Sequence, residues 1–89
     1  MESITLTDLT LGEAMAFKAI AHELKLAKEK HPKWIKGLPV QTLVVIEEAG
    51  EIAKAVVDYN MIGGSELYHH ISEEVAQTGA MCVRMWSNL

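Results

Sequence analysis

Apolar residues recur every three or four positions over most of this chain, which is the spacing of amphipathic α-helices. Three stretches show this spacing, at residues 11–31, 41–59 and 65–86. No segment alternates between apolar and polar residues as a half-buried β-strand does. The pattern therefore predicts an all-α fold, a bundle of three main helices.

Local signals predict where the first helix begins and ends. Thr10 and Glu13 have the spacing of a capping box, in which each side chain accepts a hydrogen bond from the backbone amide of the other residue. We therefore expect the first helix to begin at Leu11. Pro32 marks its end, because proline does not continue a helix.

Glycines and polar residues limit the other two helices. The second helix is expected to begin at Gln41 or Thr42, with Asn60 or the Gly63 and Gly64 pair as its stop. The third can begin at Ser65, with the serine hydroxyl as its N-cap. The apolar faces that follow from these limits comprise Leu11, Met15, Ala19, Ile20, Ala21, Leu24 and Ala27 in the first helix, Val45, Ala49, Ile52 and Val56 in the second, and Leu67, Ile71, Val75, Thr78, Cys82 and Met85 in the third.

The length of the chain limits what it can form alone. It has 89 residues, 49% of them hydrophobic, which is typical of a globular protein and too short for two domains. We expect one domain, residues 1–89, in which the first half-dozen residues are the only candidate disordered stretch. A chain of this size buries only about 60% of its unfolded surface, so we expect a homodimer or homotetramer that completes the bundle.

The sequence also bears on location. No apolar run approaches the roughly 20 residues of a membrane span, and the first residues lack the basic and apolar regions of a secretory signal. The single cysteine, Cys82, excludes an internal disulfide. We expect a cytoplasmic protein with no membrane partner.

The net charge of −4 is unevenly distributed. Residues 18–36 contain six lysines and two glutamates, a local charge of +4, so the rest of the chain carries −8. The basic segment is too sparse, and the whole chain too acidic, for a surface that binds a nucleic acid polymer. Anionic small molecules fit this distribution better, particularly if metal ions neutralise the acidic part.

Three carboxylates lie within about one turn of the second helix. Glu47 and Glu51 are four residues apart, and Glu48 and Glu51 are three apart. Like charges at these spacings repel. Gly50 beside them costs a further ~0.5–1 kcal/mol relative to alanine in a helix interior. Two local penalties within five residues indicate a functional reason, such as the close approach of a helix or a ligand.

The third helix carries a second polar group. Glu74 and Gln77 are three residues apart and share a face with His70, and Glu73 precedes them. A short connection favours antiparallel packing of the second and third helices, which would let the two groups face each other. Mg²⁺ or Mn²⁺ prefers such oxygen ligands and takes its remaining ligands from water or substrate phosphates.

A solvated helix face is the alternative explanation of the first cluster. Glu47, Glu51 and Asp58 lie opposite the apolar stripe, and glutamates at this spacing are common on exposed helices. On spacing alone, the solvated face is the preferred interpretation. No two histidines are four residues apart, so a zinc site built on histidines has little support.

Taken together, the two polar groups resemble the signature of a known family. Glu47-Glu48-x-x-Glu51, followed one helix later by Glu74-x-x-Gln77, is similar to the EExxE and ExxD motifs of the MazG-like all-α nucleoside triphosphate pyrophosphohydrolases. The resemblance runs from the loop at residues 31–34 to the end of the third helix. It implies hydrolysis of an NTP or dNTP, between the α and β phosphates, to the monophosphate and pyrophosphate.

The resemblance also implies a role for each residue of the two motifs. The second and third glutamates of EExxE and both residues of ExxD hold Mg²⁺, which points to Glu48, Glu51, Glu74 and Gln77 as ligands. Glu47 would then orient or deprotonate the attacking water. Gln77 departs from the family's aspartate, so the site has one negative charge fewer and metal affinity should fall.

Basic and aromatic side chains precede the carboxylates. Lys33, Trp34 and Lys36 combine positive charge with an aromatic face that could hold phosphates and stack on a base. The alternative is that Trp34 packs this loop on the bundle and the lysines are solvated. Lys54, one turn beyond Glu51, could reach a phosphate, although pairing with Glu51 is the preferred interpretation.

Two functions other than hydrolysis stay open. Gln77 favours a non-catalytic relative that binds a nucleotide or a metal ion. A small helical assembly protein, from a different class, would use the carboxylates only as a solvated face.

Overall fold

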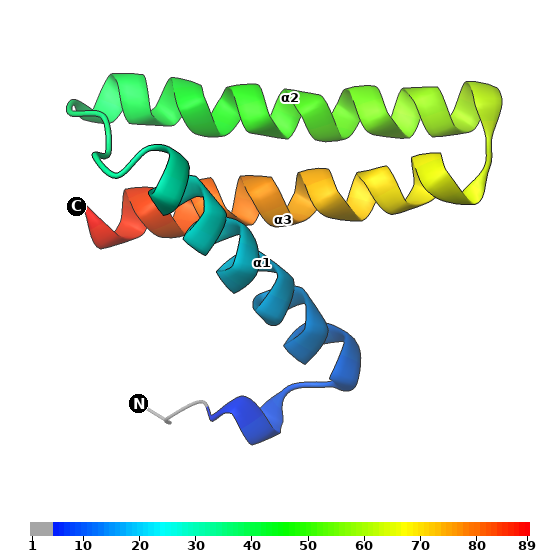
Figure 1. The fold of residues 1–89 in the computed structure, drawn as a ribbon, viewed down its shortest axis with the longest axis horizontal. Helices are drawn as coiled ribbons and strands as arrows, with labels where there is room; N and C mark the ends of the chain where they lie inside the picture. The colour runs from blue at the N-terminus through cyan, green and yellow to red at the C-terminus, as the bar shows by residue number, and fades with distance from the viewer. Residues whose placement is uncertain (1–4) are drawn as a thin grey trace.

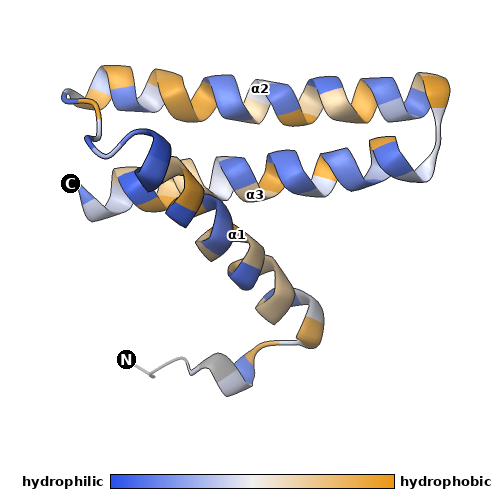
Figure 2. Cartoon of the chain, viewed as in Figure 1, coloured by the Kyte–Doolittle hydropathy of each residue, from blue (hydrophilic) through white to orange (hydrophobic). Residues whose placement is uncertain are grey.

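The computed structural model describes residues 5–89, and this part of the chain contains three α-helices and no strand (Figure 1). Helix α1 spans Leu11–Lys30, α2 spans Leu38–Ile62 and α3 spans Ser65–Ser87. The expected all-α fold class is confirmed for these residues. No helix of this part combines the length and the apolar character needed to cross a membrane, and Figure 2 shows polar and apolar positions mixed along each one.

Helix α1 begins where the capping box predicts. The Glu13 amide donates a hydrogen bond to Thr10 Oγ1 at 3.1 Å, and the Thr10 amide donates one to Glu13 Oε1 at 2.8 Å. Ahead of it, Leu6–Asp8 forms one turn of 3-10 helix, which includes the last residue of the candidate disordered stretch. Residues 1–4 of that stretch lie outside the described residues.

Helix α2 begins at Leu38, three residues before the earliest predicted start. Pro39 lies in its first turn, where the helix needs no backbone amide as a donor. Gly37 precedes the helix with a φ of 97°, and its carbonyl accepts a hydrogen bond from the Gln41 amide at 3.0 Å. Pro39, which precedes the predicted start of this helix, therefore helps to begin it.

Two glycines reverse the chain between α2 and α3. Gly63 and Gly64 have φ values of 78° and 100°, a region of the backbone that favours glycine. The Gly63 amide donates to the Tyr59 carbonyl at 2.7 Å, and α2 continues past residue 59 to Ile62, so the glycine pair and not Asn60 is the stop, as one of the two alternatives predicted. The prediction of Ser65 as N-cap is wrong. Because the glycines complete the reversal by themselves, Gly64 is the N-cap, no side chain caps α3, and Ser65 is its first residue.

The helices form an open arrangement. Helices α2 and α3 lie side by side as an antiparallel hairpin, whereas α1 crosses α3 at a steep angle and its N-terminal half projects from the hairpin (Figure 1). Gly79 allows this crossing, because a Cβ atom at that position would lie 2.7 Å from Ile20 Cδ1. Helix α3 is therefore the central element, with α1 and α2 on different sides of it.

The inner faces of the helices coincide only in part with the predicted stripes. The predicted residues that are partly buried are Ile20, Leu24 and Ala27 of α1, Val45 and Ile52 of α2, and Leu67, Ile71, Thr78 and Met85 of α3. Periodicity finds the apolar residues of a helix but does not show which of them meet another helix. In this open arrangement each helix buries only the side that contacts its neighbour. The buried apolar side chains of the described part are Ala55, Ala76 and Ala80, and the buried polar ones are Gln41, Glu74 and Arg84. The predicted inner residues that are exposed instead are Leu11, Met15, Ala19 and Ala21 of α1, Ala49 and Val56 of α2, and Val75 and Cys82 of α3.

Candidate active site

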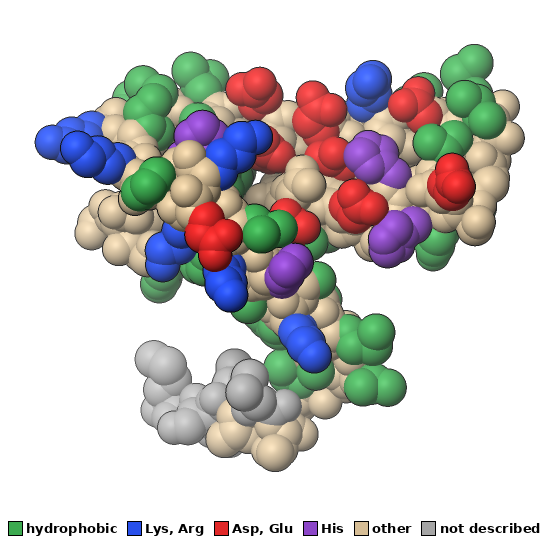
Figure 3. Space-filling model, viewed as in Figure 1, with side chains coloured by type: hydrophobic (Ala, Val, Ile, Leu, Met, Phe, Trp, Pro, Cys, Tyr) green, Lys and Arg blue, Asp and Glu red, His purple; other side chains and the backbone are tan. Residues whose placement is uncertain are grey.

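A hollow of about 300 Å³ lies where all three helices meet, and it contains two of the predicted metal ligands. Glu48 enters it from α2 and Gln77 from α3, while Glu23 and Lys30 of α1 form the other wall. Figure 3 shows acidic side chains gathered along α2 and between α2 and α3, with a group of lysines near the loop between α1 and α2. The remaining lining residues are Leu26, Ala27, His31, Ala80 and Met81.

The helix hairpin brings carboxylates of α2 and α3 together. Glu48 lies on the side of α2 that faces α3, and it is half-buried. Burial raises the pKa of the Glu48 carboxyl above its usual value, and the negative charges of Glu74, Glu47 and Glu51 raise it further. Glu48 is therefore close enough to Glu74, from the other helix, for the two charges to repel.

Glu74 is the one buried carboxylate among the described residues, with 8% of its surface exposed. Its Oε1 atom lies 3.3 Å from His70 Nε2. Its Oε2 atom is also buried but has no hydrogen-bond partner. An unpaired buried carboxylate oxygen lowers stability, so a cation or another donor at this atom would be favourable.

The side chains of Glu48, Glu74 and Gln77 offer the oxygen donors that a divalent cation needs, but they are not yet arranged as a metal-binding group. The carboxylates of Glu48 and Glu74 and the amide oxygen of Gln77 are the hard donors that Mg²⁺ prefers. A positive charge there would satisfy Glu74 Oε2 and reduce the repulsion at Glu48. In residues 5–89, however, no three His, Cys, Asp or Glu side chains already form a metal-binding group, and Glu51 is exposed.

The other predicted residues of α2 lie outside the hollow. Glu47 and Lys54 are both exposed and line none of it. The ion pairs of the described residues all involve His69 or His70, so Lys54 and Glu51 do not form one. The prediction of a Lys54 and Glu51 pair is therefore wrong, since two exposed side chains gain little from pairing in water.

The loop between α1 and α2 is anchored on α3. The Arg84 guanidinium lies over the Trp34 ring, 4.9 Å from its centroid, and donates a hydrogen bond to the His31 carbonyl at 2.8 Å. Arg84 is only 6% exposed. Trp34 therefore packs the loop on the bundle, as one of the two interpretations predicted, while Lys33 and Lys36 are exposed.

Trp34 and Lys36 line a separate hollow of about 460 Å³, together with Gln41 and Asn88. The Gln41 amide group donates to the Ile35 carbonyl at 3.0 Å, so this side chain also holds the loop. None of the predicted carboxylate ligands lines this hollow. The structure thus does not bring the loop residues and the carboxylates into one hollow.

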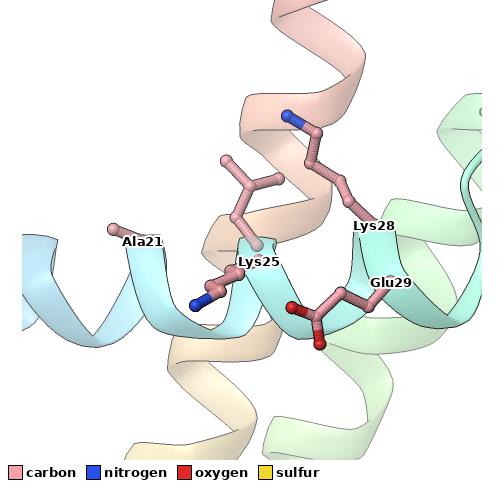
Figure 4. Close-up of a pocket in the computed structure, with 5 residues that line it drawn as sticks. Ala21, Lys25, Lys28 and Glu29 are labelled. Carbon is pink, nitrogen blue, oxygen red and sulfur yellow. The ribbon is translucent and has the colours of Figure 1, made fainter.

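A further shallow hollow, of about 400 Å³, lies on α1. Figure 4 shows its labelled side chains, Ala21, Lys25, Lys28 and Glu29, projecting from the surface of that helix. It contains no predicted site residue and mixes both signs of charge. It is therefore a less specific feature than the hollow at Glu48.

Sequence reasoning missed two cations of this region. Lys30 is seven residues from Glu23, so helical spacing alone places both on one face of α1, but only the crossing angle directs that face toward Glu48. Arg84 is the only arginine of the chain and interrupts the consecutive apolar run of residues 81–86. A charged residue at such a position was the available signal for a buried anchor.

We compared the chain with models of known protein families, with curated proteins and with solved structures, and found no match. The candidate site is therefore defined by the residues and the geometry of this chain alone.

Proposed function

We propose that this protein is a Mg²⁺-dependent nucleotide pyrophosphohydrolase that cleaves an NTP or dNTP to the monophosphate and pyrophosphate. The observation that carries this proposal is the meeting of Glu48 and Glu74, two carboxylates from different helices, beside a hollow that also holds Lys30. The resemblance of the two polar motifs to those of MazG-like enzymes supports it independently.

The proposed roles combine the positions of the side chains with the resemblance. Glu48, Glu74 and Gln77 would hold the cation from the inner side, and the resemblance adds Glu51, which is exposed one turn further along α2. Mg²⁺, or Mn²⁺ in its place, would stabilise the charge of the phosphates. By the same resemblance Glu47, which is exposed outside the hollow, would orient the water and accept its proton. The water oxygen bonds to the α-phosphorus, the bond from that phosphorus to the bridging oxygen breaks, and pyrophosphate leaves.

Lys30 is the lysine best placed for the substrate phosphates. It lines the hollow with Glu48, whereas Lys33 and Lys36 do not. An ammonium group is a compact charge well suited to phosphate. We expect Lys30→Gln to raise KM by about tenfold with a smaller effect on kcat, because the variant loses one charged hydrogen bond to the substrate. Lys33→Gln makes the same charge change on the exposed loop and should alter neither constant.

The experiment that tests the proposal is an assay of pyrophosphate release from a panel of canonical and modified nucleoside triphosphates, with Mg²⁺ or Mn²⁺. Glu48→Gln removes one charge at nearly constant shape and should reduce release by about 10- to 100-fold or more, the usual effect of weakening a metal site. Glu66→Gln, in the exposed first turn of α3, is the matched control and should keep full activity. No release from any nucleotide, or equal release by both variants, would overturn the proposal.

Gln77 favours a second candidate function, a nucleotide- or metal-binding protein without turnover. A neutral amide offers one coordinating oxygen where an aspartate offers two and a charge. This alternative predicts that nucleotides with Mg²⁺ raise the melting temperature without release of pyrophosphate. It also predicts that Gln77→Asp gains turnover, whereas the hydrolase proposal expects turnover in the wild type already.

A further inference from the structure

Glu23 is a carboxylate of the hollow at Glu48 that the proposed cation site does not use. It is half-buried and lines the hollow from α1, whereas Glu48 and Gln77 enter from α2 and α3. The charges that raise the pKa of Glu48 all belong to residues of α2 and α3. Glu23 therefore stands apart from the proposed cation ligands, on the opposite wall of the hollow.

The Glu23 carboxylate has no cationic partner among the described residues. The ion pairs within residues 5–89 all involve two histidines of α3, so Glu23 forms none, although Lys30 lines the same hollow. An ionised carboxylate has two oxygens, and both act only as hydrogen-bond acceptors. A ligand that offers hydroxyl or amino donors to Glu23 would therefore form charge-assisted hydrogen bonds with it.

Glu23 and Lys30 mark two ends of the wall that α1 contributes to the hollow. Seven residues make about two turns, so both side chains leave the same face of the helix, about 10 Å apart along its axis. Leu26 and Ala27 lie between them in sequence and add apolar surface to the same hollow. The wall therefore changes along α1 from a cation, through an apolar strip, to a carboxylate.

This order matches a nucleoside triphosphate whose phosphates lie at Lys30. The sugar is the first group beyond the α-phosphate, and in ribose its 2′ and 3′ hydroxyls are neighbouring donors on one edge of the ring. The two oxygens of a carboxylate can accept from both hydroxyls, whereas 2′-deoxyribose offers only one of them. An acidic side chain binds ribose hydroxyls in this way in dinucleotide-binding folds.

We propose that Glu23 binds the ribose hydroxyls of the substrate and makes this protein selective for ribonucleoside over deoxyribonucleoside triphosphates. The inference rests on the proposed function for the position of the phosphates, and it decides between the two sugars that the proposed function leaves open. A deoxynucleotide would leave one oxygen of a half-buried carboxylate without its donor. The loss of one hydrogen bond to a charged group corresponds to about 10- to 100-fold in binding or in kcat/KM.

Matched pairs of nucleotides test the inference: ATP with dATP, CTP with dCTP, and GTP with dGTP, each with Mg²⁺ in the assay of pyrophosphate release. In every pair, kcat/KM of the wild type should be about 10- to 100-fold higher for the ribonucleotide. Glu23→Gln should reduce this ratio by about tenfold, because an amide offers one acceptor oxygen and no charge. Glu29→Gln makes the same charge change on α1, in the separate hollow of Figure 4, and should keep the ratio of the wild type.

Dissociation constants for the same pairs, measured by titration calorimetry, separate this inference from the hydrolase proposal. Tighter binding of ribonucleotides without release of pyrophosphate would overturn the hydrolase and support the role of Glu23. Release at equal kcat/KM within each pair, or a ratio that Glu23→Gln leaves unchanged, would overturn the role of Glu23 and leave the hydrolase standing. A preference that follows the amino group of the base rather than the sugar would also overturn it, and the absence of both binding and release would overturn both.

Discussion

Glu48 shows how a single side chain can be placed for function against the requirements of stability. It occupies the inner side of α2, where an apolar residue would pack against α3. Burial and the charges of Glu74, Glu47 and Glu51 all disfavour its ionised form, so its pKa is raised. Groups that contradict local packing in this way are expected mainly at functional sites.

This arrangement predicts that Glu48→Gln stabilises the metal-free protein at neutral and alkaline pH. A raised pKa means that the folded chain binds the proton more tightly than the unfolded chain. The free energy of unfolding of the wild type therefore falls as the pH rises above the usual value of 4.5. Because solvent screens a half-exposed group, the gain in Glu48→Gln should stay below about 1 kcal/mol.

Urea unfolding with a chelator at pH 4 and at pH 8 measures this effect. The variant should exceed the wild type at pH 8 and match it at pH 4. The Thr10 amide lowers the pKa of Glu13, so that group has the opposite pH dependence, but it is present in both proteins and cancels. A difference of equal size at both pH values would contradict the electrostatic explanation.

At the scale of the elements, the crossing of α1 over α3 depends on the absence of a side chain at Gly79. A methyl group there would lie 2.7 Å from Ile20 Cδ1 and 2.8 Å from Ile20 Cγ1. Gly79→Ala should therefore lower the free energy of unfolding by about 1 kcal/mol or more, although alanine is the better helix former, because the overlap forces the helices apart. Chemical denaturation measures the change. If the overlap is the cause, Gly79→Ala should cost less in an Ile20→Ala background, which lacks both overlapping atoms, and an equal cost there would point to another cause.

The loop between α1 and α2 depends on Arg84 in a similar way. Its guanidinium holds the His31 carbonyl and covers the Trp34 ring. Arg84→Met keeps the length of the side chain but removes both interactions, so we expect a loss of about 2 kcal/mol in the free energy of unfolding. Lys33→Met, on the exposed part of the same loop, should change it by less than about 0.5 kcal/mol. Equal losses in the two variants would show that Arg84 has no special role.

The limits of the elements were largely predictable because their causes are local. The capping box at Thr10 and the glycine pair at residues 63 and 64 act within a few residues, and each marks a helix boundary in the structure. The rotation of each helix was not predictable in the same way. Ala49 and Ala55 are both alanines of α2, and only the position of α3 decides that Ala55 is buried and Ala49 is exposed.

The candidate site shows the same division between local and non-local causes. The approach of Glu48 and Glu74 follows from helical spacing and a short antiparallel connection, and it could be expected. The position of Lys30 depends on the angle at which α1 crosses α3. The packing of Trp34 depends on Arg84, fifty residues away in sequence. A local sequence pattern predicts neither the crossing angle of α1 nor the long-range contact of Trp34 with Arg84.

At the scale of the whole molecule, the open arrangement of the three helices forms the candidate site. The hollow at Glu48 is lined by residues of α1, α2 and α3, so its shape depends on how α1 crosses the hairpin.

The most direct test of the central claim, that Glu48 and Glu74 form the core of a cation site, is a titration of Mn²⁺ into the protein with the free ion followed by electron paramagnetic resonance. The wild type should bind the ion, Glu74→Gln should bind it about 10- to 100-fold more weakly, and Glu66→Gln should match the wild type. If the wild type binds no Mn²⁺, or if all three proteins bind it equally, the carboxylates of α2 and α3 do not form the proposed site.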